Sequence, residues 1–163
     1  MKLSVFLLLL LLSSASTYKN LALRGKATQS MRYEHALSAA SNAIDGNHDS
    51  LYPHGSCSHS AQQNNPWWRV DLLESYIITS IIITNRGDCC EHFINGLRIH
   101  IGNSLVRNGL QNPACAVITR ISPGAVAEFS CNGMDGRYVN IVIPDREEFL
   151  TLCEVEVYGS RLD

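Results

Sequence analysis

The sequence lacks most of the features that mark enzymes and nucleic-acid-binding proteins. Charged residues make up only 17% of the 163 residues, and the formal net charge is −2. No basic stripe is present that would follow a phosphate backbone, so nucleic acid is not an expected partner. The sequence contains no G-x-S-x-G, H-E-x-x-H, G-x-G-x-x-G or phosphate-binding glycine loop. An enzymatic function is therefore not expected.

Long apolar runs are also scarce, and the single one lies at the start. Lys2 precedes the run Val5 to Leu12, and small residues follow it. This pattern is typical of a secretory signal peptide, and the run is too short to span a bilayer. We expect residues 1–16 to be a signal peptide, residues 17–163 to form one domain, and the mature protein to be secreted without membrane insertion.

Cysteine is present in an even number, but no C-x-x-C pair occurs. The six cysteines are Cys57, Cys89, Cys90, Cys115, Cys131 and Cys153. In an exported chain this count predicts disulfides, with 15 possible pairings, and argues against a zinc ribbon or a thioredoxin-like motif.

Hydrophobic patterning predicts an all-β fold with two packed sheets. The expected strands are Tyr76–Thr84, Leu97–Gly102, Arg137–Pro144 and Leu152–Tyr158. Turn signals such as Asn95-Gly96 and Asn132-Gly133 separate the apolar runs, as in a β-sandwich. A helix is plausible only around Glu34 to Ala43, where alanine is dense.

Two of these runs also predict the directions of their side chains. The residues expected to face the core are Trp68, Val70 and Leu72 in the first run and Cys153, Val155 and Val157 in the last. On the opposite face, Arg69 and Asp71 are expected to form an ion pair. Glu154 and Glu156 are expected to point outward.

The stretch S-N-A-I-D-G-N-H-D-S, from Ser41 to Ser50, is dense in oxygen donors. Asp45, Asn47 and Asp49 alternate as in an EF-hand loop, but the glycine and the bidentate glutamate of that motif are out of register. Hard oxygen donors suit Ca²⁺ better than a soft metal. By itself the stretch favours an ordinary Asx/Gly turn over a cation site.

The stretch T-N-R-G-D-C-C-E-H-F, from Thr84 to Phe93, has several interpretations. A zinc site on Cys89, Cys90 and His92 is disfavoured, because neighbouring strand residues point to opposite faces. The two cysteines pair either with distant partners or with each other. Neighbouring Cα atoms are about 3.8 Å apart, so the second choice closes a strained ring. Arg-Gly-Asp also suggests integrin-type adhesion, although a surface turn is the commoner explanation.

Taken together, these stretches resemble the F-type lectins, and among them the eel fucolectins, which are fucose-binding agglutinins. The resemblance covers nearly the whole mature chain, through N-A-I-D-G-N, H-G-S-C-S-H, N-P-W-W-R-V-D-L, T-N-R-G-D-C-C and G-R-Y-V. It implies a discoidin-like, galactose-binding-domain-like β-sandwich jelly roll.

The resemblance also implies three disulfides and a structural Ca²⁺. The implied pairs are Cys57 with Cys153, Cys115 with Cys131, and Cys89 with Cys90. The implied calcium ligands are Asn42, Asp45, Asn47, Ser56, the Cys153 carbonyl and Glu154, all of which match the family.

The family's sugar motif is a His, then Arg-x-Asp, then a final Arg or Lys. His59, Arg86 and Asp88 match the motif, whereas Phe93 stands where the final basic residue belongs. The resemblance implies that the His and the basic residues donate hydrogen bonds to fucose, and that the Cys89–Cys90 disulfide offers an apolar face. A hydrogen bond from a charged group contributes roughly 1.5–3 kcal/mol, so its loss weakens a site about 10- to 100-fold.

The resemblance therefore predicts a secreted, calcium-dependent, fucose-binding lectin that recognises fucosylated glycans on cells or microbes in innate defence. The family's homotrimeric assembly is a further implication. Phe93 supports an alternative, a lectin-fold module with weakened or altered sugar specificity. Adhesion through Arg86-Gly87-Asp88 is a second alternative.

Overall fold

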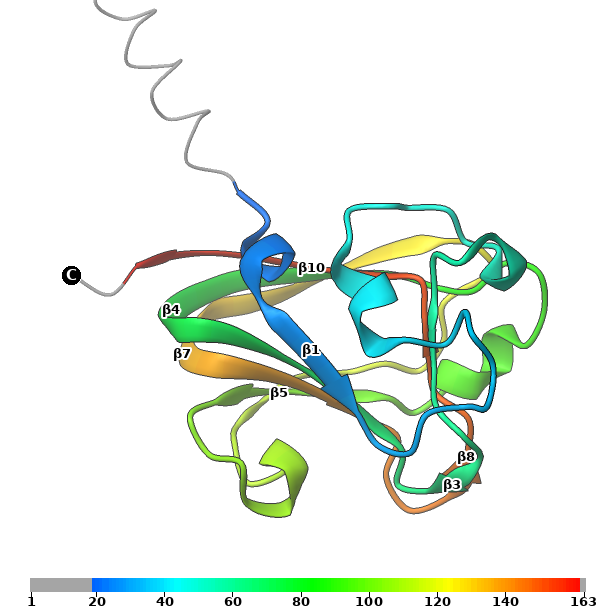
Figure 1. The fold of residues 1–163 in the computed structure, drawn as a ribbon. Coiled ribbons are helices and arrows are strands. Elements are labelled where there is room, and N and C mark those ends of the chain that lie inside the picture. The colour runs from blue at the N-terminus through cyan, green and yellow to red at the C-terminus, as the bar shows by residue number, and fades with distance from the viewer. Residues whose placement is uncertain (1–18, 162–163) are drawn as a thin grey trace, which may run out of the picture.

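The computed structural model describes residues 19–161 as an all-β protein built around one six-stranded sheet (Figure 1). The strands of this sheet are β1 (Lys26–Gln29), β4 (Trp67–Thr84), β7 (Val126–Val142), β5 (Arg98–Gly102), β6 (Ala114–Val117) and β10 (Glu154–Arg161). The order is β1-β4-β7-β5-β6, and β10 pairs with the second half of β4. Every pairing is antiparallel. The predicted all-β class is confirmed; the expected signal peptide, residues 1–16, lies outside the described residues.

Two short ribbons and five 3₁₀ turns complete the described chain. β2 (Ser58–His59) pairs with β9 (Thr151–Leu152), and β3 (Gln63–Asn64) pairs with β8 (Glu147–Glu148). The 3₁₀ helices are η1 (Leu21–Arg24), η2 (Ala40–Ile44), η3 (Tyr52–His54), η4 (Glu91–Ile94) and η5 (Val106–Gly109). Among the described residues, no helix is both long and apolar enough to cross a bilayer.

The expected helix over Glu34 to Ala43 is wrong, since the described chain forms only the single turn η2 there. Ala39 is extended, at φ −61° and ψ 140°, and has no side chain that can cap a helix. The indole of Trp68 donates its N–H to the Ala40 carbonyl at 3.0 Å. Tertiary contact with the core therefore determines the conformation of this segment, and the helix propensity of alanine does not.

The core follows the alternation that the sequence predicts. Trp68 and Val70 are fully buried, and Leu72 is 4% exposed. On the opposite face the expected Arg69–Asp71 ion pair is wrong. Asp71 accepts two hydrogen bonds from Arg137, at 2.7 and 2.9 Å, whereas the Arg69 guanidinium lies 4.8 Å from the centre of the Trp67 ring. The partner of Asp71 comes from the neighbouring strand β7, which a local pattern does not reveal.

The last strand contains a second departure from the expected pattern. Cys153, Val155 and Val157 are fully buried as predicted, but Glu154 is fully buried as well. The loop after η2 covers this side of β10, and Gly46 donates its N–H to Glu154 Oε2 at 2.7 Å. Alternation along a strand predicts the face of a side chain and leaves open what covers that face.

Three disulfides join the cysteines in the pairs that the family resemblance implies. They are Cys57–Cys153, Cys89–Cys90 and Cys115–Cys131. Because Cys89 and Cys90 bond to each other, the zinc interpretation of that stretch is wrong.

The two ends of the described chain lie at one side of the molecule, across from η4 and the β3–β8 ribbon (Figure 1). Asn20 ties these ends together, because its Oδ1 accepts hydrogen bonds from Ala22 N at 3.1 Å and from Val157 N at 3.0 Å.

Candidate functional site

His59 lies on β2 and is only 5% exposed. Its Nδ1 is 2.7 Å from the Ser60 carbonyl, to which it donates. Burial lowers the pKa of His59, so the neutral ring is favoured. In that tautomer Nε2 carries no proton and is available as an acceptor, which differs from the donor role that the resemblance implies.

Arg86 follows the end of β4 and is held in one orientation by Asp88. The guanidinium donates from Nε to Oδ1 and from Nη2 to Oδ2, both at 2.9 Å. The ring of Tyr52 lies 4.6 Å from the guanidinium carbon. The Arg86 hydrogen bonds, together with Tyr52 N–H donating to Oδ1 at 3.1 Å, hold the pKa of Asp88 below its ordinary value. The result is an ordered cation whose Nη1 makes no hydrogen bond to a described residue.

The same geometry argues against the adhesion hypothesis. Arg86 is only 8% exposed, and its charge is paired with Asp88 of the same tripeptide. Gly87 is fixed as well, since its N–H donates to the Ser50 carbonyl at 2.8 Å. An integrin-type Arg-Gly-Asp has to present both charges to the partner, which this turn does not do.

The Cys89–Cys90 disulfide leads directly into η4, where Phe93 lies. Cys90 has a left-handed backbone, φ 65°, and its carbonyl accepts the N–H of Phe93 at 3.1 Å. The Phe93 ring contacts the Phe149 ring, with centroids 5.2 Å apart. Phe149 in turn meets the His59 ring edge-on at 5.5 Å.

These residues follow one another around the site, and we call them the site ring. Its members are Arg86, Tyr52, His59, Phe149, Phe93, the Cys89–Cys90 disulfide and Asp88. Side-chain contacts join Arg86 to Phe93, and the backbone joins Phe93 through the Cys89–Cys90 disulfide to Asp88. One side holds the hydrogen-bonding groups Arg86, Asp88 and His59, and the other side is aromatic and sulfur. A few directed polar groups beside an apolar wall are the usual composition of a small-ligand site.

Phe149 and Tyr33 also belong to this neighbourhood and were not predicted from the sequence. Phe149 lies in the loop after β8, and Tyr33 stacks on His59 with centroids 4.5 Å apart. Each is far from the motif in sequence, and each reaches His59 only through the β2–β9 pairing or the bridge between Arg32 and Ser60. A single aromatic residue in a polar loop carries no signal that would have identified it.

Of the residues implied as calcium ligands, Asp45 lies close enough to Glu154 to affect its charge, and the others make their own local hydrogen bonds. Ser56 Oγ is buried and hydrogen-bonds the Asp49 carbonyl, and Asn42 donates its Nδ2 to the Leu37 and Cys57 carbonyls at 2.9 and 3.2 Å. Asp45 Oδ1 accepts the N–H of Asn47 at 2.9 Å, which is the Asx turn that the sequence alone favoured. Among the described residues no cluster of three His, Cys, Asp or Glu side chains is suited to a metal. A cation here would depend on backbone, hydroxyl and amide oxygens in addition to the carboxylates of Asp45 and Glu154.

Glu154 provides the test of that fit. Burial, with Asp45 and Glu156 adding like charge, raises the pKa of Glu154 to about 8. Its Oε1 is buried and has no hydrogen-bond partner among the described residues. An orphaned carboxylate oxygen beside Asp45 fits a hard cation such as Ca²⁺, which would satisfy that oxygen and neutralise the charge.

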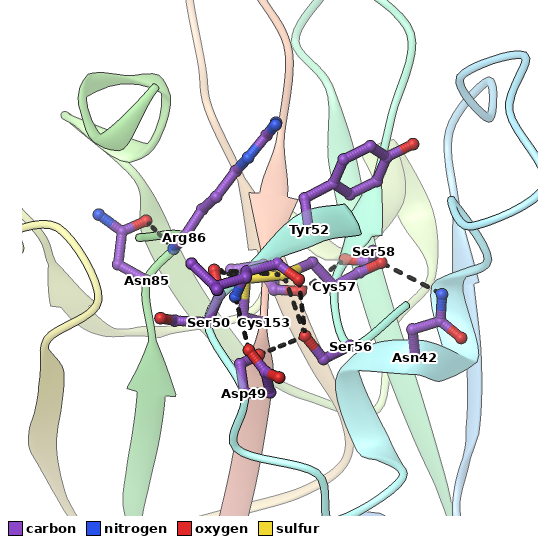
Figure 2. Close-up of a disulfide and its surroundings, with 12 residues drawn as sticks. Asn42, Asp49, Ser50, Tyr52, Ser56, Cys57, Ser58, Asn85, Arg86 and Cys153 are labelled. Carbon is purple, nitrogen blue, oxygen red and sulfur yellow. Dashed lines mark hydrogen bonds between the residues drawn. A yellow bond between two sulfur atoms is a disulfide. The ribbon is translucent and has the colours of Figure 1, made fainter. Parts of the chain in front are cut away.

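The Cys57–Cys153 disulfide connects the site ring to this loop. Figure 2 shows Arg86 and Tyr52 on one side of the disulfide and Asp49 and Ser56 on the other. The bridge closes a separation of 96 residues. Backbone atoms add a second link, because Ser50 of the loop accepts the N–H of Gly87.

Comparisons with known proteins point to one family. Residues 42–141 match the model of the NedA-like, galactose-binding domain. A fucolectin of Anguilla anguilla is 57% identical over 145 residues, which cover 86% of this chain and 91% of the relative.

Solved structures agree with that match. A fucolectin from the serum of striped bass, Morone saxatilis, has a TM-score of 0.86 and 59% identity over 88% of this chain, which spans only 50% of the bass chain. The lectin domain of lectinolysin, solved with Lewis b antigen, has a TM-score of 0.75 and 29% identity, over 88% of this chain and 98% of that chain. The predicted discoidin-like sandwich is thereby confirmed.

Proposed function

This chain belongs to the fucolectin family of galactose-binding-like domains, and on that premise we propose that it is a fucose-binding lectin that recognises fucosylated glycans. As a member of a lectin family it is a carbohydrate-binding module, not an enzyme. The observation that carries the proposal is the site ring, in which buried His59 and Asp88-oriented Arg86 occur together with the Cys89–Cys90 disulfide.

The chemistry of the ring suits a deoxyhexose. The Arg86 guanidinium donates to sugar hydroxyls, and His59 Nε2 accepts from one of them. Asp88 fixes the guanidinium before the ligand arrives, which reduces the entropy lost on binding. The Cys89–Cys90 disulfide offers a flat apolar surface on which the C–H face of the sugar can pack. Each charge-assisted hydrogen bond contributes about 1.5–3 kcal/mol, so two anchors support only weak binding of a monosaccharide.

We also propose that Ca²⁺ is a structural cofactor of the loop that carries Asp45. Glu154 and Asp45 would supply carboxylate oxygens, with Asn42, Asn47, Ser56 and the Cys153 carbonyl completing the set. Bound there, the ion would neutralise the buried carboxylate and would have a structural role only. Support comes from the orphaned Glu154 Oε1 and from the nearby carboxylate of Asp45.

The biological setting is part of the same proposal. We infer a secreted, extracellular protein that acts in innate defence by binding fucosylated glycans on cell or microbial surfaces. Assembly as a homotrimer would raise the avidity of a weak site 10²-fold or more, an order-of-magnitude expectation for linked sites. The serum origin of the striped bass fucolectin supports the extracellular placement.

Calorimetric titration of the calcium-loaded protein with L-fucose tests the function. We expect weak but saturable binding, with D-glucose as the control sugar that gives no heat of binding. A glycan array probed with the native oligomer should show fucosylated glycans above all others. Absence of fucose binding in both assays would reject the proposal.

One observation favours a second candidate, a lectin-fold module with altered specificity. Phe93 replaces the basic residue of the motif, and its ring packs against the ring of Phe149. If the missing donor limits fucose binding, Phe93→Arg should strengthen it about tenfold. His92→Arg is the matched control, because His92 is the exposed neighbour and the change adds the same charge. Equal affinities of wild type and Phe93→Arg would count against this candidate.

A further inference from the structure

Building on the proposed function, we propose that Phe93 and Phe149 form a subsite for a second sugar, the ring to which fucose is linked. On this basis the fucose unit lies against the polar side of the site ring and the disulfide, and the neighbouring pyranose packs its C–H face on the two phenylalanines. The preferred ligand is then an oligosaccharide, and free fucose is a partial ligand.

The first support is the position of the two rings. Phe149 contacts the fucose anchor His59 at 5.5 Å and Phe93 at 5.2 Å, so the pair continues the site outward from His59. Both residues keep part of their surface exposed. Each separation is comparable to the width of one pyranose ring. The wall that runs from His59 to Phe93 is therefore longer than a single sugar requires.

The second support is that Arg146 holds together the two segments that carry the phenylalanines. Arg146 donates from Nη2 to the Phe93 carbonyl at 2.9 Å and from Nη1 to the Asn95 carbonyl. The same side chain pairs with Glu148 at 3.7 Å, and Glu148 accepts the N–H of Phe149 at 3.0 Å. One arginine thus links η4, which carries Phe93, to the loop that carries Phe149. A wall held in place this way loses little entropy when a ligand binds.

The third support is chemical. The phenylalanine side chains of the site ring have no hydrogen-bond donor or acceptor. They cannot replace the water that hydrates sugar hydroxyl groups, so they suit the C–H face of a pyranose. Aromatic packing contributes roughly 0.5–1.5 kcal/mol beyond the burial of area, which corresponds to about two- to tenfold in affinity. That gain partly offsets the hydrogen bond that the sugar motif loses at Phe93.

Calorimetry with two ligands tests the subsite. We compare methyl α-L-fucoside with the trisaccharide 2′-fucosyllactose, in which a galactose carries the fucose. Wild type should bind the trisaccharide five- to tenfold more tightly. Phe149→Leu and Phe93→Leu should each weaken trisaccharide binding by a larger factor than methyl α-L-fucoside binding, so that most of the trisaccharide's advantage is lost. Phe129→Leu is the matched control, because Phe129 lies on β7 and packs against the core.

The outcomes separate this inference from the function it rests on. If wild type binds neither ligand, the proposed function fails and the subsite fails with it. If wild type binds both ligands equally and the leucine variants change nothing, the lectin function stands and the subsite is refuted.

A measurement on the unmodified protein covers the case in which a variant does not fold. Only three phenylalanines, Phe93, Phe129 and Phe149, lie in the described chain, so their ring signals are readily assigned in protein labelled with ¹³C-phenylalanine. With 2′-fucosyllactose bound, we expect nuclear Overhauser contacts from the rings of Phe93 and Phe149 to the galactose unit, and none from Phe129. Contacts from those two rings to the fucose unit alone would overturn the assignment.

Discussion

Two carboxylates near the binding loops, Asp88 and Glu154, have opposite electrostatic environments. Asp88 accepts two hydrogen bonds from Arg86 and one from the backbone, and its pKa is lowered. Glu154 is fully buried, has no cationic partner among the described residues, and has a pKa raised to about 8. The first carboxylate is compensated by the chain itself, and the second is left for something outside the chain to compensate.

The different environments of the two carboxylates give the two loops different roles. A carboxylate that is satisfied internally can orient another group, and Asp88 orients Arg86 toward a ligand. A buried carboxylate that is not satisfied weakens the fold unless a proton or a cation accompanies it. Glu154 therefore makes its loop dependent on solution conditions, whereas the Arg86–Asp88 turn is largely independent of them.

The largest expected effect comes from breaking the compensated pair. Arg86→Met removes the sugar's charged donor and leaves Asp88 with its backbone partner only. We expect fucose affinity to fall by more than about 100-fold, since more than one charge-assisted hydrogen bond is lost. Arg137→Met is the control, because it breaks the similar two-bond pair with Asp71 outside the site ring. Calorimetry should show Arg137→Met binding as wild type does; equal losses in both variants would contradict a specific role for Arg86.

The uncompensated carboxylate should give the next largest effect, on stability. A carboxyl with a pKa near 8 in the folded state and near 4.5 in the unfolded state holds a proton that the unfolded chain has released. Without a cation, the free energy of unfolding therefore falls as pH rises through this range and levels off above pH 8. Between pH 6.5 and 8 the loss is on the order of 2 kcal/mol.

Thermal unfolding in EDTA and in calcium checks this expectation. The interval from pH 6.5 to 8 lies above most of the influence of His59, whose lowered pKa reduces stability mainly below its ordinary value of 6.5. Chelated wild type should melt roughly 5 °C lower at pH 8 than at pH 6.5. Calcium or Glu154→Gln should flatten this dependence. An unchanged melting temperature on chelation at pH 8 would show that the loop holds no Ca²⁺.

The smallest expected effect comes from making Asp88 neutral. Asp88→Asn keeps one acceptor oxygen but loses the charge and the second oxygen, so Arg86 is held less firmly. We expect fucose to bind about five- to tenfold more weakly, with little change in fold. Titration of the variant and of wild type in parallel measures the difference. An affinity unchanged within twofold would mean that Arg86 needs no positioning by Asp88.

The sequence predicted the parts of this molecule that depend on local patterns and on matched motifs. The alternation around Trp68 and in the last strand identified core side chains, and the resemblance implied the pairing of all six cysteines. The first signal is carried by neighbouring residues, so no knowledge of tertiary contacts is needed to interpret it. The cysteine pairing came from the family resemblance, since the residues alone left 15 pairings open.

The predictions that were wrong or missing concern residues whose surroundings come from a distant segment of the chain. Glu154 was expected in solvent because a strand pattern does not show that Gly46 lies over it. Asp71 was paired with its neighbour Arg69 because the true partner, Arg137, lies on another strand. Phe149 was missed because its contact with Phe93 joins two loops that share no motif.

The hydrogen bonds of Asn20 to both ends of the described chain have a practical consequence. Since both ends leave the molecule across from η4 and the β3–β8 ribbon, a tag, a surface or a fused module attached at either end leaves the glycan-facing loops unobstructed (Figure 1). Several copies anchored in this way would all display their loops in the same direction, which is the orientation that engagement of a densely fucosylated surface requires.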